Sequence, residues 1–498
     1  MPVRPLDREQ AWLLPPTLEE LIPENHPARF AAAFVDSLDR RAWLELGAPL
    51  EGEPLGAPEY HPRALLSVWV YGFMTGVRST RKLEAACRDA MPYLWLTGWQ
   101  HPDHNTLWRF YQAHRQSMRC ILKRTVRVAV HMGLIDLAVQ AVDGTKVKGD
   151  AAKDRTYDAA GLKRLLERTE AAIRDLEGQN ETGGDPPPPH LPRALAQKER
   201  LRQQVQEALA RVEREEGGER TNLTDPDAGL MKSRQGIVAG YNLQAMVSPL
   251  DPAVAPRGGL LLTGLEVTTD ADDHEQLVPM LEIAEEVTGR RAEVTLADAG
   301  YHSGANLWAC AEAGRIIVMP EAQEKAVSRP YHREHFIYAA DTDTYTCPQG
   351  EVLHCTGVKQ RLGRAVAWVY RASGAACRCC PAFGICTRDK RQGRALEVGP
   401  YDELLRRHRE WMATPEAKAA YQRRKELPEP AFGIMKEQQG GRRFLLRGLA
   451  NVRAEGTLLG IAFNLRTLWR VGCAWSDKTR QWTLAAMPMQ RGSAKSAA

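Results

Sequence analysis

Residues 138–148, Ala138-Val-Gln-Ala-Val-Asp-Gly-Thr-Lys-Val-Lys148, alternate between apolar and polar side chains and end in polar ones. This pattern is typical of a β-strand. Two more extended stretches, Gly236–Val247 and Gly259–Thr268, are separated by a turn that contains Pro and Asp residues. From His274 to Val287 the apolar residues recur at helical spacing, and Gly289 follows that helix. The sequence therefore predicts three strands followed by a helix.

The same pattern continues with a strand at Ala292–Ala297, a helix at Gly304–Ala313 and a strand at Ile316–Met319, which Pro320 ends. The order strand, strand, strand, helix, strand, helix, strand predicts a hairpin followed by right-handed crossovers. Such an arrangement builds a mixed sheet that is covered by helices. We therefore predict an α/β fold class for this part of the chain.

Two inserts interrupt this core. Leu162–Glu216 is highly charged, carries apolar residues from Leu201 to Val212 on one helical stripe, and has Pro186–Pro189 in its middle. It is predicted to be a helical hairpin packed as a short coiled coil. The second insert, between Pro320 and Pro400, is β-rich and contains cysteines. The predicted parts are a tail at 1–15, a helical domain at 16–134, the core at 135–160 and 219–320, the helical insert at 161–218, the β insert at 321–400, C-terminal helices at 401–475 and a tail at 476–498.

The N-terminal part is predicted to be all α-helical. Its apolar residues recur at helical spacing after Pro62, and Asp103 starts a run of capping residues before a helix expected at Leu107–Gln116. Several short helices with basic side chains favour a DNA-binding domain that resembles a helix-turn-helix. Other short helical domains share this pattern.

Length and composition narrow the class of protein. With 498 residues and 43% hydrophobic residues, the chain predicts several domains and excludes global disorder. The sequence shows no apolar run of the roughly 18–20 residues that span a membrane, and no signal-peptide pattern in residues 1–20. We expect a soluble protein that is not secreted. From Leu404 to Arg470 there are 14 Lys and Arg against 6 Asp and Glu, which indicates either a surface for a polyanion or a solvated helical face.

Two aspartates are expected where strands end. Asp143 is placed at the end of the first strand and Asp298 at the end of the fourth. In a sheet of the predicted order these strands are neighbours, and functional groups collect at the carboxyl ends of strands. Two such carboxylates can bridge a pair of hard divalent cations, which stabilise the attacking and leaving oxygens of a phosphoryl displacement. Alternatively, each aspartate caps a turn beside a glycine.

A third carboxylate is expected from a C-terminal helix. Glu429 lies between Pro428 and Pro430, and prolines are tolerated in a first helical turn, so Glu429 is predicted at a helix start. Arg424 and Lys436 are candidate phosphate contacts on nearby turns. Glu426 is the rival ligand, and a plain surface glutamate is the other alternative.

These residues occur in short motifs that resemble those of insertion-sequence transposases with a DDE catalytic domain. The motifs are Asp143-Gly-Thr-Lys146, Gly240-Tyr-Asn-Leu-Gln244, Asp298-Ala-Gly-Tyr-His-Ser303 and Glu429-Pro-Ala-Phe-Gly433. Arg442-Arg-Phe-Leu-Leu-Arg-Gly448 is similar to the C-terminal helices of the family, and residues 16–120, with Arg78-Ser79 and Pro102–Thr106, are similar to its N-terminal domain. The resemblance covers nearly the whole chain.

The resemblance implies an RNase H-like fold and a triad of Asp143, Asp298 and Glu429 that binds two Mg²⁺ ions, for which Mn²⁺ can substitute. It implies an enzyme of the bacterial cytoplasm, associated with the nucleoid when bound to DNA, that cuts the terminal inverted repeats of its own element and joins them to target DNA. Because two ends must be cut together, we expect a homodimer, and no membrane partner. The residues expected to bind DNA are Lys146, Lys148, Arg424, Lys436, Arg442, Arg443 and Arg447.

The sequence departs from the family pattern near the third acid. A related signature has Tyr, Arg, Glu and Lys, which Tyr421, Arg424, Glu429 and Lys436 match, but Arg424 lies one residue further from Glu429 than that signature expects. The block Asn222–Asp227 is also present, and its Asp225 and Asp227 are either accessory ligands or parts of an Asp-Pro-Asp turn. Asp270, Asp273 and His274 are better explained as a capping run before a helix than as metal ligands.

The cysteines of the β insert suggest a second metal site. Cys347, Cys377, Cys380 and Cys386 provide four thiolates, with CxxC spacing in the middle pair, which suits a tetrahedral structural zinc ion. Insert domains of similar transposases carry a comparable set. Cys355 and Cys379 are spare or alternative ligands, and the other interpretation is a set of small apolar cysteines. The cysteines assigned to cores are Cys87, Cys120, Cys310 and Cys473.

Two rival functions remain open at this point. One is a catalytically inactive or repurposed DNA-binding protein of the same fold, and the other is an RNase H-like nuclease without strand transfer. Inverted repeats beside the coding region, in several copies, would favour the transposase.

Overall fold

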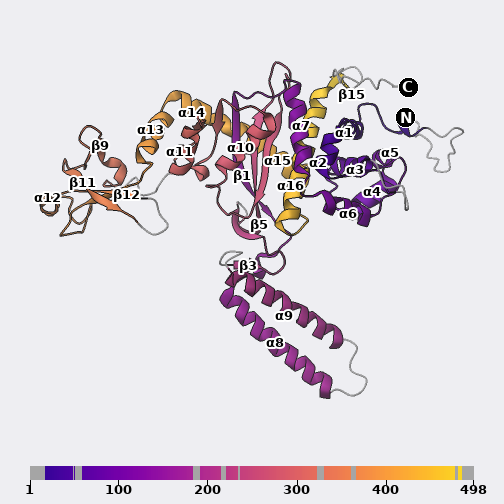
Figure 1. The fold of residues 1–498 in the computed structure, drawn as a ribbon, viewed down its shortest axis with the longest axis horizontal. Coiled ribbons are helices and arrows are strands. Elements are labelled where there is room, and N and C mark those ends of the chain that lie inside the picture. Colours follow the sequence, from indigo (N-terminus) through magenta and orange to yellow (C-terminus); the bar gives the residue numbers. More distant parts are fainter. Residues whose placement is uncertain are drawn as a thin grey trace, which may run out of the picture. The chain divides into compact units, whose positions relative to one another are not determined.

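The computed structural model describes residues 17–48, 50, 59–182, 191–214, 220–233, 236–321, 330–360, 366–476 and 481–484 (Figure 1). The chain divides into two compact units. The first unit comprises Met1–Ala271, Met280–Ala292 and Lys425–Ala498, and the second comprises Asp272–Pro279 and Glu293–Arg424.

The first unit begins with short helices, which confirms the helical character expected of this part. They are η1 (Leu18–Leu21), α1 (Pro27–Asp36), α2 (Arg40–Leu46), α3 (Pro62–Met74), α4 (Thr80–Asp89), α5 (Met91–Leu96), α6 (His104–His114) and α7 (Arg119–His131). Helix α6 starts at His104, earlier than the expected Leu107, because the Asp103 carboxylate accepts a hydrogen bond from the Thr106 amide at 2.7 Å and caps the helix there.

The sheet of the first unit is built around one long strand. Strand β5 (Gly236–Pro249) pairs antiparallel with β1 (Val139–Lys148), with β6 (Leu260–Thr268) and with β4 (Gly229–Ser233). The predicted first strand and the predicted hairpin are confirmed as β1, β5 and β6. Strand β4 was not predicted. Gly240 lies where β5 meets β1, and a Cβ there would overlap the Val147 carbonyl oxygen, so only glycine fits.

The register of β1 and β5 determines which side chains share a face. Asp143 lies opposite Ala245, and Thr145 lies opposite Leu243. Successive residues of a strand point to opposite faces, so Asp143 and Thr145 share one face and Lys146 lies on the other.

Helices cover both faces of this sheet. On the Asp143 face lie α15 (Pro428–Glu437), which packs on β1 and β5, and α16 (Leu449–Gly472), which packs on β6 and, as Figure 1 shows, runs beside α7. Gly456 lets α16 approach the sheet, since a Cβ there would lie 2.7 Å from a methyl carbon of Val267. On the opposite face, α10 (Leu277–Thr288) approaches Gly264 through Met280 and Ile283. The predicted α/β layering is confirmed for this unit.

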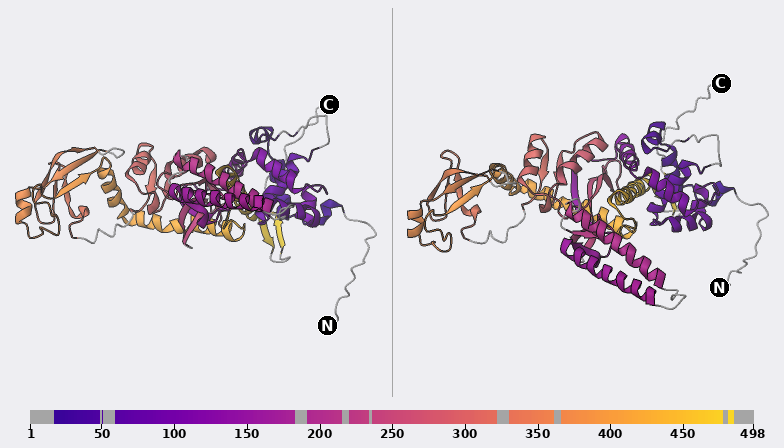
Figure 2. Two further views of the ribbon diagram at one scale, coloured as in Figure 1. Left: turned by 90° about the horizontal axis from the view of Figure 1, so that it is seen from below. Right: turned by 60° about the horizontal axis from the view of Figure 1, so that its bottom comes forward.

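The helical insert forms a hairpin, as predicted. Helices α8 (Ala159–Thr182) and α9 (Leu191–Glu213) lie side by side in all views (Figures 1 and 2). The short strands β2 (Thr156–Asp158) and β3 (Arg220–Asn222) pair at its base. Pro186–Pro189 lie outside the described residues. The buried apolar residues between the helices and at the base are Leu162, Val205, Ala208 and Leu223.

The second unit contains a βαβ element and a separate antiparallel sheet. Strands β7 (Val294–Leu296) and β8 (Ile316–Val318) are parallel and are connected through η3 (Ala299–Tyr301) and α11 (Gly304–Glu312). Both strands are shorter than predicted. The unit also contains α13 (Asp402–Met412) and α14 (Pro415–Gln422), followed by η5 (Arg423–Glu426).

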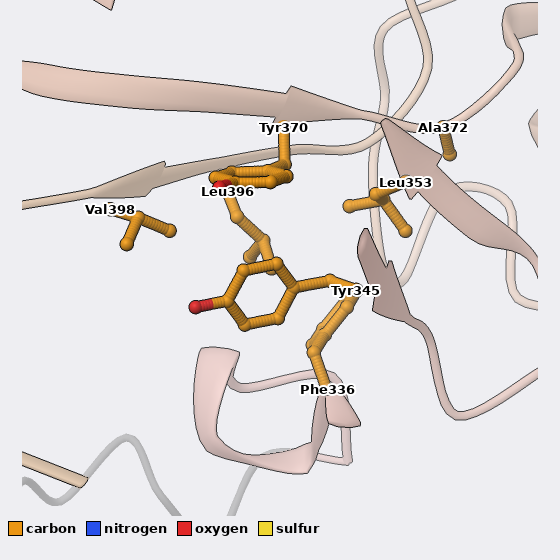
Figure 3. Close-up of a cluster of buried hydrophobic side chains, with 7 residues drawn as sticks. All are labelled: Phe336, Tyr345, Leu353, Tyr370, Ala372, Leu396 and Val398. Carbon is orange, nitrogen blue, oxygen red and sulfur yellow. The ribbon is translucent and has the colours of Figure 1, made fainter. Parts of the chain in front are cut away.

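The β insert is a five-stranded antiparallel sheet in the order β13-β12-β11-β10-β9. Its strands are β9 (Ile337–Ala339), β10 (Thr344–Thr346), β11 (Val352–Lys359), β12 (Ala367–Arg371) and β13 (Ala395–Val398), with η4 (Arg333–His335) before them and α12 (Gly374–Cys379) between the last two. Figure 3 shows the small core of this sheet, in which Tyr345 and Tyr370 pack with Leu353 and Leu396. The β-rich character predicted for this insert is confirmed. Near the end of the chain, β14 (Cys473–Ser476) pairs with β15 (Gln481–Leu484).

Candidate active site

Asp143 lies within strand β1 and not at its end, so the sequence-based placement was wrong. Pairing with β5 continues through Lys148, because Thr145 and Val147 keep the alternation that a strand needs. The Asp143 side chain is half-buried, and one carboxylate oxygen accepts a hydrogen bond from the Gly144 amide at 2.9 Å. The carboxylate is thus fixed locally by the glycine that follows it.

Helix α15 brings further functional groups to the same face. The predicted helix start is confirmed, since Pro428 is the first residue of α15 and the exposed Glu429 is the second. Lys436 donates a hydrogen bond from Nζ to the Thr145 hydroxyl. Glu429 and Lys436 are seven residues apart, which is close to two full helical turns, so they lie on the same flank of α15. This flank faces the strand that carries Asp143.

Asp298 lies just beyond β7, as predicted. Its Oδ1 accepts a hydrogen bond from the Gly300 amide at 2.8 Å, so it caps η3, and its side chain is 34% exposed. Arg424 approaches Oδ2 with a guanidinium nitrogen at 3.5 Å, and the Arg424 side chain is only 10% exposed. Arg424 was predicted to contact DNA phosphates, but in the structure its guanidinium group faces Asp298. The turn beside a glycine, the alternative considered for both aspartates, is therefore present at Asp298, whereas Asp143 lies within a paired strand.

The three carboxylates belong to different units. Asp143 and Glu429 lie in the first unit and Asp298 lies in the second. Among the residues that the structure describes, no group of three or more His, Cys, Asp or Glu side chains is arranged to hold a metal ion as it stands. All three carboxylates are at least partly accessible and offer the oxygen ligands that Mg²⁺ prefers. The donor chemistry therefore fits Mg²⁺.

The two lysines predicted in β1 do not share the face of Asp143. Lys146 lies opposite Asn242, on the other face of the sheet, and is half-buried. Lys148 points to that face too, at the exposed end of the strand, and its carbonyl oxygen accepts a hydrogen bond from the Phe444 amide at 2.9 Å. A phosphate contact next to Asp143 is therefore better suited to Lys436 than to either of them.

The predicted arginines lie in one segment, Gly440–Gly448, which we call the basic segment. Arg442 pairs with Glu437 at 2.5 Å. Arg443 and Arg447 both pair with Asp150, the latter at 2.8 Å. Each of the three arginine side chains remains about half exposed.

Asp225 and Asp227 have a structural role that the sequence did not reveal. The Gly448 amide donates to Asp225 at 3.0 Å, and the Leu449 amide donates to Asp227 at 2.8 Å. Both aspartates thereby bind the N-terminus of α16, where a negative charge is favourable. The Tyr241 hydroxyl also donates to Asp225 at 2.7 Å. The Ala228 amide donates to the Asp225 carbonyl oxygen at 3.0 Å, so the expected Asp-Pro-Asp turn is present, and its two carboxylates in addition bind the start of α16.

Two histidines near Asp298 were not singled out. The rings of His302 and His408 lie 5.9 Å apart, and His408 Nε2 is 2.8 Å from the Met319 carbonyl oxygen. Burial lowers the pKa of both imidazoles, so they favour the neutral form. His302 belongs to the motif at Asp298, which was the only signal for it in the sequence.

The predicted cysteines separate into two groups. Cys347, Cys377, Cys380 and Cys386 line one small cavity in the β insert, whereas Cys355 and Cys379 are exposed and do not line it. Cys87 and Cys310 are buried, as predicted for core residues, and Cys120 is only half-buried. The side chain of Cys473 lies outside the described residues.

Two family models match the chain. The one described as Transposase DDE domain matches residues 346–469, and the one described as Transposase domain (DUF772) matches residues 16–113. The first range includes Glu429, whereas Asp143 and Asp298 lie outside both ranges. Neither a curated protein nor a solved structure matches the chain. Within the described part of the chain, every helix is too short or too polar to cross a bilayer.

Proposed function

Because the two matched regions identify this chain as an insertion-sequence transposase of the DDE type, we propose that it cuts the ends of its own element and joins them to target DNA. The proposed route is two-metal phosphoryl transfer with Asp143, Asp298 and Glu429 as the acidic residues. A DDE domain implies an RNase H-like fold, and the helix-covered sheet of β1, β5 and β6 is compatible with that fold.

The observation that carries this proposal is the position of α15 on the Asp143 face of the sheet. The hydrogen bond from Lys436 to Thr145 fixes one end of the flank that also carries Glu429. Thr145 and Asp143 are two residues apart on one face of β1, so Glu429 and Asp143 belong to the same side of the first unit. Asp298, at the end of β7, is proposed to complete the set.

When bound, two Mg²⁺ ions would activate the attacking oxygen and stabilise the leaving oxygen. The three carboxylates would hold the ions through oxygen ligands. Arg424 keeps a positive charge beside Asp298. Lys436 would hold a phosphate oxygen of the DNA near the face that carries Asp143, where the strand has to be placed for attack.

Binding of DNA is proposed to involve the basic segment. Phosphate groups would compete with Asp150 and Glu437 for the guanidinium groups of Arg442, Arg443 and Arg447. Such contacts would make the affinity fall with rising salt concentration. Two ends have to be cut in one complex, so we propose that the protein acts as a homodimer on its terminal repeats.

The experiment that tests this function is cleavage and strand transfer in vitro, with DNA that carries the flanking sequences of the gene and with Mg²⁺. The Glu429→Ala variant should lose more than about 100-fold in cleavage rate, since loss of residues that merely orient a metal ligand already costs about 10–100-fold. Its affinity for the same DNA, measured without metal, should stay within about threefold of wild type, because Glu429 is an exposed acid.

Glu426→Ala is the matched control, since Glu426 is exposed and lies just before α15. If Glu426→Ala lost cleavage while Glu429→Ala kept full activity, Glu426 and not Glu429 would be the third acidic residue. Absence of cleavage by the wild-type chain on bound end DNA would overturn the transposase proposal in favour of an inactive DNA-binding protein. Cleavage without joined products would favour a nuclease.

A further inference from the structure

The β insert places four cysteines around one cavity. Cys347 follows β10, Cys377 lies in α12, and Cys380 and Cys386 lie in the loop after that helix. All four line the cavity, together with Arg394, Glu351, three polar residues and a few apolar side chains. None of the described cysteines forms a disulfide. Four thiols from three different loops and helices therefore meet at one place without being cross-linked.

Backbone amides donate hydrogen bonds to three of these sulfurs. Cys347 Sγ accepts from the amides of Gln349 at 3.4 Å and Glu351 at 3.3 Å. Metals bind cysteine as the thiolate, and a cysteine sulfur can accept hydrogen bonds from backbone amides. The turn that supplies these donors, Cys347-Pro-Gln-Gly350, depends on Gly350, whose φ is 85°. The backbone of this turn thus directs two amide groups at the sulfur of Cys347.

The other two donors show the same arrangement. The Ala382 amide donates to Cys380 Sγ at 3.4 Å, and the Arg394 amide donates to Cys377 Sγ at 3.4 Å. Exposed Cys355 and Cys379 accept no such bond in the described residues. The amide hydrogen bonds thus mark three of the four cavity cysteines, since within the described residues Cys386 Sγ accepts none either.

Charge also favours a cation at this place. Four thiolates around one cavity would repel one another strongly, and a divalent cation would reduce their net charge to about −2. Arg394 lines the same cavity and supplies a further positive charge. Its Nε is buried and has no hydrogen-bond acceptor within the described part of the chain. The cavity therefore offers donors and charge that suit a thiolate cluster.

We propose that Cys347, Cys377, Cys380 and Cys386 bind one structural Zn²⁺ ion that joins the turn after β10 to the loop after α12. Four sulfur ligands are the usual tetrahedral shell of structural zinc. As the side chains lie, the sulfurs form no closed coordination shell. Binding would therefore draw them inward by rotation about their side-chain bonds.

The small hydrophobic core of the β insert explains why a metal ion would stabilise this domain. The sheet of the insert spans residues 337–398, about 60 residues, and domains of that size rarely gain enough stability from one hydrophobic core without a disulfide or a metal. Its buried apolar cluster is the small set shown in Figure 3, and Cys347, Cys377 and Cys386 pack against that set. Zinc binding would add a cross-link beside this core, and the inference does not depend on the proposed transposition.

The test is the metal content of the full-length protein, purified without a metal-affinity column and measured by mass spectrometry of the elements. The wild-type chain should contain about one zinc per chain and no stoichiometric iron. Cys377→Ser and Cys386→Ser should lose the zinc. The matched controls Cys355→Ser and Cys379→Ser should keep it, because these exposed side chains do not line the cavity.

A second measurement covers the case in which a variant fails to fold. A thiol-specific mercurial should release the zinc of the wild-type protein in proportion to the thiols modified, and removal of the ion should lower the thermal midpoint of the β insert. The proposal would be overturned if the wild-type protein contained no zinc, or contained an iron–sulfur cluster in its place. A disulfide between two of the four cysteines, or equal zinc in all four variants, would overturn it as well.

Discussion

The buried ion pair of Arg78 and Glu455 provides a test of how the first unit is held together. The two side chains are 3% and 2% exposed and come from positions far apart in the chain. Arg78 also donates to the carbonyl oxygens of Gly440 and, at 2.9 Å, of Arg443. The Glu455 carboxylate accepts in addition from the amide of Leu445 at 3.0 Å. One pair therefore connects the start of α4, the basic segment and α16.

We predict that Arg78→Ala lowers the free energy of unfolding of the first unit by about 3–5 kcal/mol. Removal of the cation leaves the Glu455 carboxylate buried without a counter-ion, which is the situation that costs this amount in other proteins. Two carbonyl oxygens of the basic segment lose their charged donor as well. The total free energy of unfolding of a domain is only about 5–15 kcal/mol, so the effect is large.

The matched control is Arg41→Ala. Arg41 pairs with Glu45 within one helix, and its side chain is 80% exposed, so its loss should change stability by less than about 0.5 kcal/mol. Urea unfolding followed by circular dichroism measures both variants, and hydrogen exchange at Leu445 and Leu446 localises the loss.

A double variant separates charge burial from packing. Arg78→Met with Glu455→Gln buries no charge, and the Gln oxygen can still accept from the amides of Leu445 and Leu446. It should recover at least half of the stability lost in Arg78→Ala. If Arg78→Ala were no less stable than Arg41→Ala, the reasoning from burial would be refuted.

Two further predictions concern the sheet and the second unit. Gly240→Ala should lower the free energy of unfolding by about 1–3 kcal/mol, because the new Cβ would overlap the Val147 carbonyl oxygen. Gly178→Ala in α8, which has open space around it, should raise the free energy of unfolding by up to about 1 kcal/mol. Thermal unfolding compares the two variants, and equal midpoints would contradict the predicted overlap. Burial lowers the pKa of His302 and His408 below the ordinary value of 6.5, so below that pH the unfolded chain binds more protons than the folded one. The stability of the second unit should therefore fall as the pH drops from about 6.5 toward the pKa of these histidines in the folded protein. His408→Gln should reduce this pH dependence. An unchanged slope of stability against pH in that variant would contradict the assignment to His408.

Local patterns in the sequence were sufficient to predict helices and strands and one feature of the candidate site. Alternation in residues 138–148 predicted β1, and the apolar stripe from Leu201 to Val212, with the prolines before it, predicted the hairpin of α8 and α9. Pro428 and Pro430 correctly predicted that Glu429 lies in a first helical turn. Each of these features depends on neighbours within a few residues, which spacing along the chain can show.

Contacts between distant parts of the chain could not be predicted in this way. Asp143 was placed at a strand end because the Asp-Gly pair suggests a turn, yet pairing with β5 extends the strand to Lys148. Arg424 is turned toward Asp298, although its sequence surroundings are those of an exposed basic helix. The acids of Asn222–Asp227 bind the N-terminus of α16, more than 200 residues later, and no spacing rule reports such a contact.

The basic segment shows why these distant contacts matter for the proposed function. Its backbone is fixed by partners from four places in the first unit, while its arginine side chains stay about half exposed. Those partners are Arg78, Lys148, Asp225 and Glu455. A segment held in this way loses little conformational entropy when its arginines bind phosphates, and reduced ordering cost is a main source of affinity. Several of the motifs that resemble the transposase family, such as Arg78-Ser79 and Asn222–Asp227, therefore serve to position the segment that we propose to bind phosphates.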